Sequence, residues 1–153
     1  MMPTYVCSVP PKSLSDDQKD QIAAAIGRRH SEATGAPRFF VQVVIQESDT
    51  TRRYLGGELS GAHIWVRGDI RAGRSESVRS ALMLAIMKDV SAIAAFPEAA
   101  IWVYLCNLEP TDMVEFGHVL PVPGDEQAWF EGLPPDLQTY LAGLSAKRET
   151  FQL

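Results

Sequence analysis

The feature that most constrains this fold is a strand–helix–strand pattern that occurs twice within 153 residues. The two copies cover approximately residues 3–47 and 62–106, and the apolar runs 64–66 and 101–103 share the sequence Ile-Trp-Val. Two strands joined by a helical crossover pair in parallel. The pattern therefore predicts one α+β domain, in which two fused β-α-β units form a mixed sheet with helices on one face.

Local signals mark where both helices begin and end. Ser15 opens a capping box, and Ser75 is a favourable N-cap for the second helix. Gly35 and Pro37 are expected to end the first helix, and Pro97 to break the second. Alternating or β-branched apolar residues predict the strands, at residues 5–9, 39–46, 64–66 and 101–105.

The rest of the chain is less regular. Residues 48–61 read as a polar, Gly-rich connection between the two units. A C-terminal helical arm is expected over about 120–153, with a turn around Pro123 and helices at 126–130 and 135–144. The last residues are expected to pack on a neighbouring subunit or to fray.

Charge and composition exclude several classes of function. The formal net charge is −5, which argues against nucleic acid and anionic membranes as partners. The two cysteines lie in apolar runs and fit a reducing compartment. Without a leader pattern or an apolar run near the ~20 residues that cross a bilayer, we expect a cytoplasmic protein. An anionic ligand would have to be bound by a local cluster of positive charge.

The strongest local signal for chemistry precedes the second helix. Arg71 and Arg74 lie just before the N-cap Ser75. A helix N-terminus already carries partial positive charge, so arginines there are unfavourable unless an anion lies between them. The alternative is that both arginines are solvated or paired with Asp69 and Glu76. The residues by themselves leave both interpretations open.

Pro3 and Glu115 also allow two interpretations each. Proline is ordinary at the start of an edge strand, but a chain that begins at Pro3 would carry a secondary amine, and free α-amino groups titrate near ~8. Glu115 is flanked by apolar residues, so it is either a general base with a raised pKa or a solvated loop residue.

Tyr104 allows two interpretations, and His30 has an ordinary one. Strand alternation places Tyr104 on the face opposite Val103 and Leu105, where it either packs or orients a water. His30 lies near the end of the first helix, where the helix dipole favours histidine. The other histidines and the cysteines share no ligand spacing, and no nucleotide motif is present, so no metal or cofactor is expected.

Five segments taken together resemble a known family. They are Met-Pro-Thr-Tyr at residues 2–5, the helix end at His30, Arg71-Ala-Gly-Arg74-Ser75, Trp102-Val103-Tyr104, and Met113-Val114-Glu115-Phe116-Gly117. In this order they resemble the cis-3-chloroacrylic acid dehalogenase family of the tautomerase superfamily. The likeness runs from Met2 through Phe130 and so covers most of the chain.

The resemblance implies a tautomerase or MIF-like homotrimer. It also implies a hydratase or hydrolytic dehalogenase that adds water to small unsaturated carboxylates such as cis-3-haloacrylate. Arg71 and Arg74 would bind the substrate carboxylate and polarise the alkene, with help from His30. Tyr104, reaching in from a neighbouring subunit, and Glu115 would activate water.

Pro3 would be the amino-terminal general acid, which requires a free nitrogen. The chain begins Met1-Met2-Pro3. A start at Met2 followed by removal of that methionine would expose the amine. Retention of Met1 and Met2 would leave an amide that cannot titrate, and the protein would then be a catalytically silent trimeric homologue.

Three departures from the family concern the substrate more than the fold. Phe116 stands where the family has tyrosine, His118 stands where it has arginine, and the loop over residues 52–61 is slightly shorter. An alternative activity is the keto–enol tautomerisation of a 2-keto acid such as phenylpyruvate. In that reaction Pro3 would act as a neutral base, and Glu115 would be dispensable.

Overall fold

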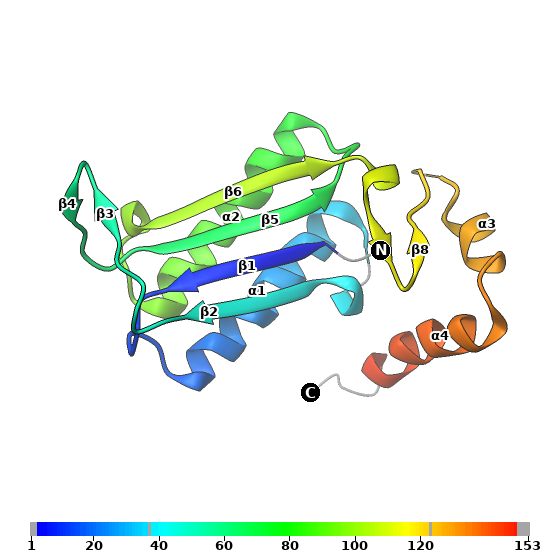
Figure 1. The fold of residues 1–153 in the computed structure, drawn as a ribbon, viewed down its shortest axis with the longest axis horizontal. Helices are drawn as coiled ribbons and strands as arrows, with labels where there is room; N and C mark the ends of the chain where they lie inside the picture. Colours follow the sequence, from blue (N-terminus) through cyan, green and yellow to red (C-terminus); the bar gives the residue numbers. More distant parts are fainter. Residues whose placement is uncertain (1–2, 37, 123, 150–153) are drawn as a thin grey trace.

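A computed structural model describes residues 3–36, 38–122 and 124–149 (Figure 1). Its centre is a four-stranded sheet, in the spatial order β2 (Gln42–Glu47), β1 (Thr4–Val9), β5 (Ile64–Arg71) and β6 (Ile101–Leu108). The pairs β1–β2 and β5–β6 are parallel, and β1–β5 is antiparallel. The mixed sheet of two fused β-α-β units is therefore confirmed.

Some of the sequence predictions fall on residues outside those that the structure describes. These are Met1, Met2, the helix-ending Pro37, the turn residue Pro123 and residues 150–153 at the end of the arm.

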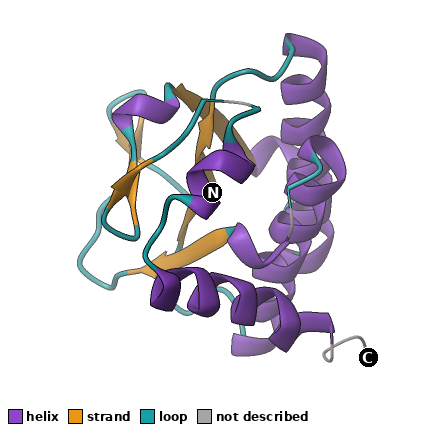
Figure 2. Cartoon of the chain, turned by 90° about the vertical axis from the view of Figure 1, so that its right-hand side faces the viewer, coloured by secondary structure: helices purple, strands orange, loops and turns teal. Residues whose placement is uncertain are grey.

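Two long helices cover one face of the sheet, as Figures 1 and 2 show. The first, α1 (Asp16–Thr34), begins with both hydrogen bonds of the Ser15 capping box and ends at Gly35, whose φ of 74° suits glycine. The second, α2 (Glu76–Ala94), begins where Ser75 Oγ accepts a hydrogen bond from Val78 N. It ends at Ala95, two residues before the predicted break.

The core lies between the sheet and these helices. Alternate residues of β1 and β5 point into it and are nearly inaccessible to solvent, among them Tyr5, Cys7 and Val66. Burial of such apolar side chains stabilises a fold by about 1.5–3 kcal/mol each. The opposite face of the sheet is open in the single chain, although it carries large apolar side chains, Trp65, Trp102 and Tyr104.

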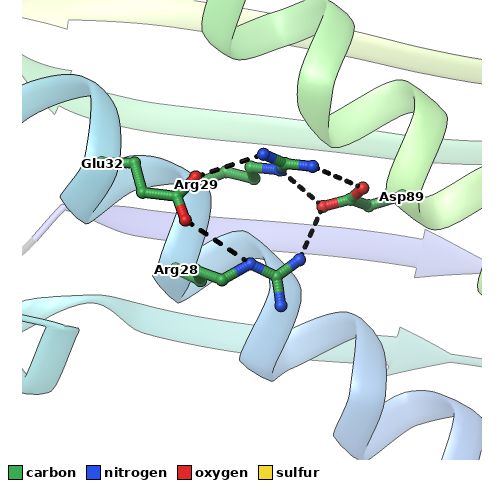
Figure 3. A network of polar contacts seen from close by, with 4 residues as sticks. All are labelled: Arg28, Arg29, Glu32 and Asp89. Carbon is green, nitrogen blue, oxygen red and sulfur yellow. Dashed lines mark hydrogen bonds and ion pairs between the residues drawn. The ribbon is translucent and has the colours of Figure 1, made fainter.

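A charged network joins the two helices at their surface (Figure 3). Asp89 of α2 accepts two hydrogen bonds from Arg29 of α1, at 2.7 and 3.0 Å, and one from Arg28 at 3.0 Å. Glu32 contacts both arginines one turn further along α1. The network joins the helix pair at a partly exposed site, where the side chain of Asp89 is 18% exposed and solvent still screens the ion pairs.

Short elements explain where the sequence predictions were wrong. Residues 39–46 were predicted as a strand, but Arg38–Phe40 form the 3₁₀ turn η1 and β2 starts only at Gln42. The connection over 48–61 contains a hairpin, β3 (Tyr54–Leu55) and β4 (Glu58–Leu59). Its two-residue turn is Gly56-Gly57, both with positive φ. A strand of two residues is too short to show the alternation of apolar and polar residues by which strands are predicted.

Further short elements complete the chain after α2. They are the 3₁₀ turns η2 (Glu98–Ala100) and η3 (Pro110–Asp112), the hairpin strands β7 (Val114–Glu115) and β8 (His118–Val119), and the helices α3 (Glu126–Glu131) and α4 (Pro135–Glu149). Within the described ranges, no helix is long and apolar enough to cross a membrane.

The C-terminal arm folds back onto its own chain. Trp129 Nε1 of α3 donates to the carbonyl of Val119 at 2.8 Å. The ring of Tyr140 in α4 contacts Phe116 at the β7–β8 turn, and Leu133 and Leu141 are buried. Residues 129–141 of the arm are therefore tied to the chain's own β7–β8 hairpin, and the prediction that the last residues pack on a neighbouring subunit or fray stays a prediction.

Candidate active site

One end of the sheet brings together residues that are far apart in the sequence. Because β1 and β5 are antiparallel, with Thr4 opposite Asp69, the start of β1 lies beside the end of β5 (Figure 1). Pro3 therefore lies close to the end of β5 at Arg71. Pro3 is buried, and its carbonyl accepts a hydrogen bond from Gln42 N at 2.9 Å.

The turn from β5 to α2 holds both arginines at this end. Ala72 N donates to the carbonyl of Leu108 at 2.8 Å, which ties the turn to the end of β6. Gly73 has a φ of 111°, a conformation that only glycine adopts readily. The side chain of Arg79 donates to the carbonyl of Arg74 from within α2. The two guanidinium groups thus come from a short, anchored turn at a helix N-terminus.

Arg71 has a partner that the sequence did not reveal. Its Nη2 donates to Glu126 Oε1 at 2.8 Å, and Arg71 is only 13% exposed. The other carboxylate oxygen of Glu126 accepts from Gly124 N at 2.7 Å. Hydrogen bonds from its own backbone N–H and from Arg71 lower the pKa of Glu126. Asp69, one of the two expected partners, accepts instead from Arg67 at 3.1 and 3.2 Å.

His30 is buried rather than exposed at a helix end. It is 5% exposed, and its Nδ1 lies 2.8 Å from the hydroxyl of Tyr5. Burial, and then the charge of Arg74, lower the pKa of His30 to about 4. The ring is therefore neutral at pH 7, so an attraction between a charged ring and the helix dipole does not explain its position.

Glu115 lies in a hairpin at the same end of the sheet (Figure 1). It is half-buried and pairs with His118 across β7 and β8. The two turn residues, Phe116 and Gly117, both have positive φ, at 53° and 80°. Such a two-residue turn suits glycine, but it places Phe116 in a backbone region that costs a non-glycine residue about 1–2 kcal/mol. The hairpin gives Glu115 a defined position. The sequence alone had also allowed a solvated loop residue.

Within one chain, Tyr104 lies away from Pro3, the two arginines and Glu115. It pairs with Arg67 in the middle of β6, four residues before Leu108, which corresponds to about 13 Å along a strand. Its side chain lies on the open face, as alternation predicted, and the residue is 50% exposed. It contacts Trp65 and lines a cavity of about 330 Å³ that extends toward the β3–β4 hairpin.

The cysteines lie apart from this group. Cys7 is buried in β1, and burial raises the pKa of its thiol to about 12, so it is inert. Cys106 is a half-buried free thiol in β6. Among the residues that the structure describes, no three His, Cys, Asp or Glu side chains gather as a metal site would require.

Comparisons with known proteins agree with this architecture. Residues 2–132 match the family described as "Putative oxalocrotonate tautomerase enzyme". The crystal structure of N1, a member of the cis-3-chloroacrylic acid dehalogenase family, is 30% identical, with a TM-score of 0.82 over 92% of this chain and 99% of that one. None of the curated proteins matches the sequence.

More distant structures share the fold. A fused 4-OT solved as a symmetric trimer is 24% identical, with a TM-score of 0.70 over 76% of this chain and 94% of that one. The macrophage migration inhibitory factor of Toxoplasma gondii is 18% identical, with a TM-score of 0.65 over 76% of this chain and 99% of that one. From the family match and the similarity to N1, the chain belongs to the tautomerase superfamily and, within it, to the cis-3-chloroacrylic acid dehalogenase family.

Proposed function

We propose that this protein adds water to small unsaturated carboxylates such as cis-3-haloacrylate, as a hydratase or hydrolytic dehalogenase. The observation that carries the proposal is the grouping of Pro3, His30, Arg71, Arg74 and Glu115 at one end of the sheet. It supplies an anion site, a carboxylate base and a potential amine acid. The family membership established above supports the same reaction class.

The arginines account for binding and for electrophilic activation. The chain as a whole carries a net charge of −5, so this local pair of guanidinium groups is what would attract a carboxylate. Addition of water to the alkene moves negative charge toward that carboxylate. Arg71 and Arg74 stabilise the charge where it develops, which is usually a large part of catalysis. His30 is neutral and adds a hydrogen bond.

Glu115 and Pro3 complete the addition on opposite sides of the double bond. The carboxylate of Glu115 takes a proton from water, and the oxygen forms a bond to C3 of the substrate. The Pro3 ammonium gives its proton to C2. With a 3-chloro substrate the product is 3-chloro-3-hydroxypropanoate, which loses hydrogen chloride and leaves malonate semialdehyde.

Tyr104 enters the site in this proposal from a neighbouring subunit of a homotrimer. The tyrosine lies about 13 Å along β6 from the arginine end of its own chain. The open sheet face around it carries Trp65 and Trp102, and large exposed apolar patches mark protein interfaces. A related fused 4-OT is a symmetric trimer, which supports the same assembly here.

The decisive experiment compares two forms of the protein that differ only at the N-terminus. Mass spectrometry establishes which residue begins the chain in each. The form that begins at Pro3 should release chloride from cis-3-chloroacrylate, whereas the form that retains Met1 and Met2 should not, because the Pro3 nitrogen is then an amide. Absence of turnover by the Pro3 form, with haloacrylates and with acetylenic acids alike, would overturn the proposal.

The second candidate activity is keto–enol tautomerisation of a 2-keto acid such as phenylpyruvate. The description of the matching family favours it. Pro3 would then be a neutral base that moves a proton between carbon and oxygen. Replacement of Glu115 separates the two activities, because Glu115→Gln should abolish hydration and leave tautomerisation intact.

A further inference from the structure

A buried tyrosine lies beside the proposed carboxylate site. Tyr5 is 0% exposed, and His30 Nδ1, at 2.8 Å, is the hydrogen-bond partner of its hydroxyl within the described part of the chain. The ring packs against Gly68 of β5, where an added Cβ would come within 2.4 Å of Tyr5 Cε1. Gly68 thus leaves the space that this ring needs in order to reach His30.

The burial of Tyr5 determines the direction of the hydrogen bond. Burial raises the pKa of the phenol, so the hydroxyl keeps its proton. A buried O–H that finds no acceptor is costly, and Nδ1 of His30 is the acceptor within reach. The Tyr5 hydroxyl therefore donates to Nδ1, and the proton of the neutral imidazole lies on Nε2.

The Nε2 atom of His30 differs from Nδ1 in its surroundings. Nε2 makes no hydrogen bond to any of the described residues, in contrast to Nδ1. The ring is close enough to Arg74 for the guanidinium charge to act on it. The two ring nitrogens point in different directions, so the hydrogen bond with Tyr5 uses Nδ1 and leaves Nε2 without a partner among the described residues.

We propose that Tyr5 is a positioning residue that fixes His30 as the Nε2–H tautomer, so that the site offers the substrate carboxylate a neutral hydrogen-bond donor beside Arg74. The inference deepens the proposed function, because it assumes a carboxylate ligand. In the opposite tautomer, Nε2 would present a lone pair to the carboxylate and repel it. Tyr5 thereby determines whether His30 attracts or repels the substrate.

The tautomer can be measured without any turnover. Nitrogen-15 NMR distinguishes protonated from unprotonated ring nitrogens, and the chain has only three histidines. His30→Gln assigns the signals. The wild-type protein at pH 7 should show His30 with a protonated Nε2 and a bare Nδ1, and Tyr5→Phe should shift this ring toward a mixture of tautomers. Tyr140→Phe, which removes an exposed hydroxyl elsewhere, should leave the His30 signals unchanged.

A protonated Nδ1 in the wild type would overturn the inference, even if Tyr5→Phe failed to fold. So would an unchanged tautomer in a folded Tyr5→Phe protein. Because these spectra need no substrate, they decide the tautomer even if the proposed reaction itself proves wrong.

Ligand binding tests the second half of the inference. Propanoate, a carboxylate that cannot react, should shift the His30 Nε2–H signal in the wild type and bind more weakly to Tyr5→Phe. In an active preparation, Tyr5→Phe should raise KM for cis-3-chloroacrylate by about tenfold to a hundredfold, the value of a hydrogen bond to a charged group, with a smaller change in kcat. Unchanged propanoate affinity, or a loss confined to kcat, would contradict the role in binding.

Discussion

The two ends of the central sheet are built from the same kinds of element, a strand start, a helix end and a strand-to-helix turn. They differ in the side chains that these turns carry. At one end, β1 begins, α1 ends, and the β5–α2 turn carries Arg71 and Arg74. At the other end, β5 begins after His63, α2 ends, and the β1–α1 turn begins with Pro10-Pro11. The repeated β-α-β unit thus forms the same scaffold at both ends, but only one end carries Arg71 and Arg74 at the β5–α2 turn, and the proposed anion site depends on those two residues.

The ends also differ in what covers them. The arginine end meets the C-terminal arm, which supplies Glu126 to Arg71. The other end meets the β3–β4 hairpin, where Arg53 donates to the carbonyl of His63 at 2.9 Å and to Ser8 Oγ at 2.6 Å. That arginine links backbone segments. It also lines the apolar cavity that Tyr104 shares, so an arginine at this end serves a different purpose.

The largest expected effect comes from removing charge at one end only. Under the proposed function, Arg74→Ala should lower kcat/KM for halide release by about 100-fold or more, because the proposed donor to the developing charge is lost. Arg52→Ala, which removes an exposed arginine at the other end, should leave kcat/KM nearly unchanged. Steady-state kinetics of both variants measure the two losses of kcat/KM. Equal losses would contradict the expected difference between the two ends of the sheet.

The next largest effect concerns His30, which should make the free energy of unfolding depend on pH. The pKa of His30 is lowered to about 4 in the folded protein, so between pH 6.5 and 4 the unfolded chain binds the extra proton. Stability should therefore fall by up to about 3 kcal/mol as the pH drops through this range. Urea unfolding at pH 7 and pH 4.5 measures it.

His30→Gln should reduce this acid sensitivity without abolishing it. Asp89, held by Arg29 above all, and Glu126 also have lowered pKa values and stabilise the fold less as they become protonated. The same acid-induced loss in the variant as in the wild type would contradict the assignment to His30.

A third prediction compares packing at the two ends with two glycines. Gly68→Ala should destabilise the protein by about 1–3 kcal/mol, since its Cβ would overlap the ring of Tyr5. Gly61→Ala, near the β3–β4 hairpin, meets nothing within 4 Å and should stay within about 0.5 kcal/mol of the wild type. Thermal unfolding of the pair measures the difference. Equal melting temperatures would mean that the arginine end is no more tightly packed than its counterpart.

The smallest expected effect lies outside both ends, in the helix layer. Asp89→Asn removes the charge that Arg28 and Arg29 share, and should lower stability by about 1 kcal/mol, because solvent screens these partly exposed ion pairs. The activity of the folded protein should not change. A marked loss of kcat/KM would show that the helix layer, and not only the sheet end, controls the site.

Features that depend on residues close together in the chain could be predicted from the sequence. The capping box at Ser15, the N-cap at Ser75 and the helix end at Gly35 involve hydrogen bonds over a few residues, so they were predictable. The doubled strand–helix–strand pattern likewise predicted the mixed sheet, because periodicity reports which face of each element is buried. Local resemblance also identified Arg71, Arg74 and Glu115 as candidates.

Which of these residues contact one another depends on the packing of the whole chain. The antiparallel pairing of β1 with β5 brings Pro3 to the end of β5, and the return of the C-terminal arm brings Glu126 to Arg71. The same packing buries His30 against Tyr5 and leaves Tyr104 on the open face. These contacts join residues 25 and 55 positions apart, so they depend on how the whole chain packs and not on any local preference.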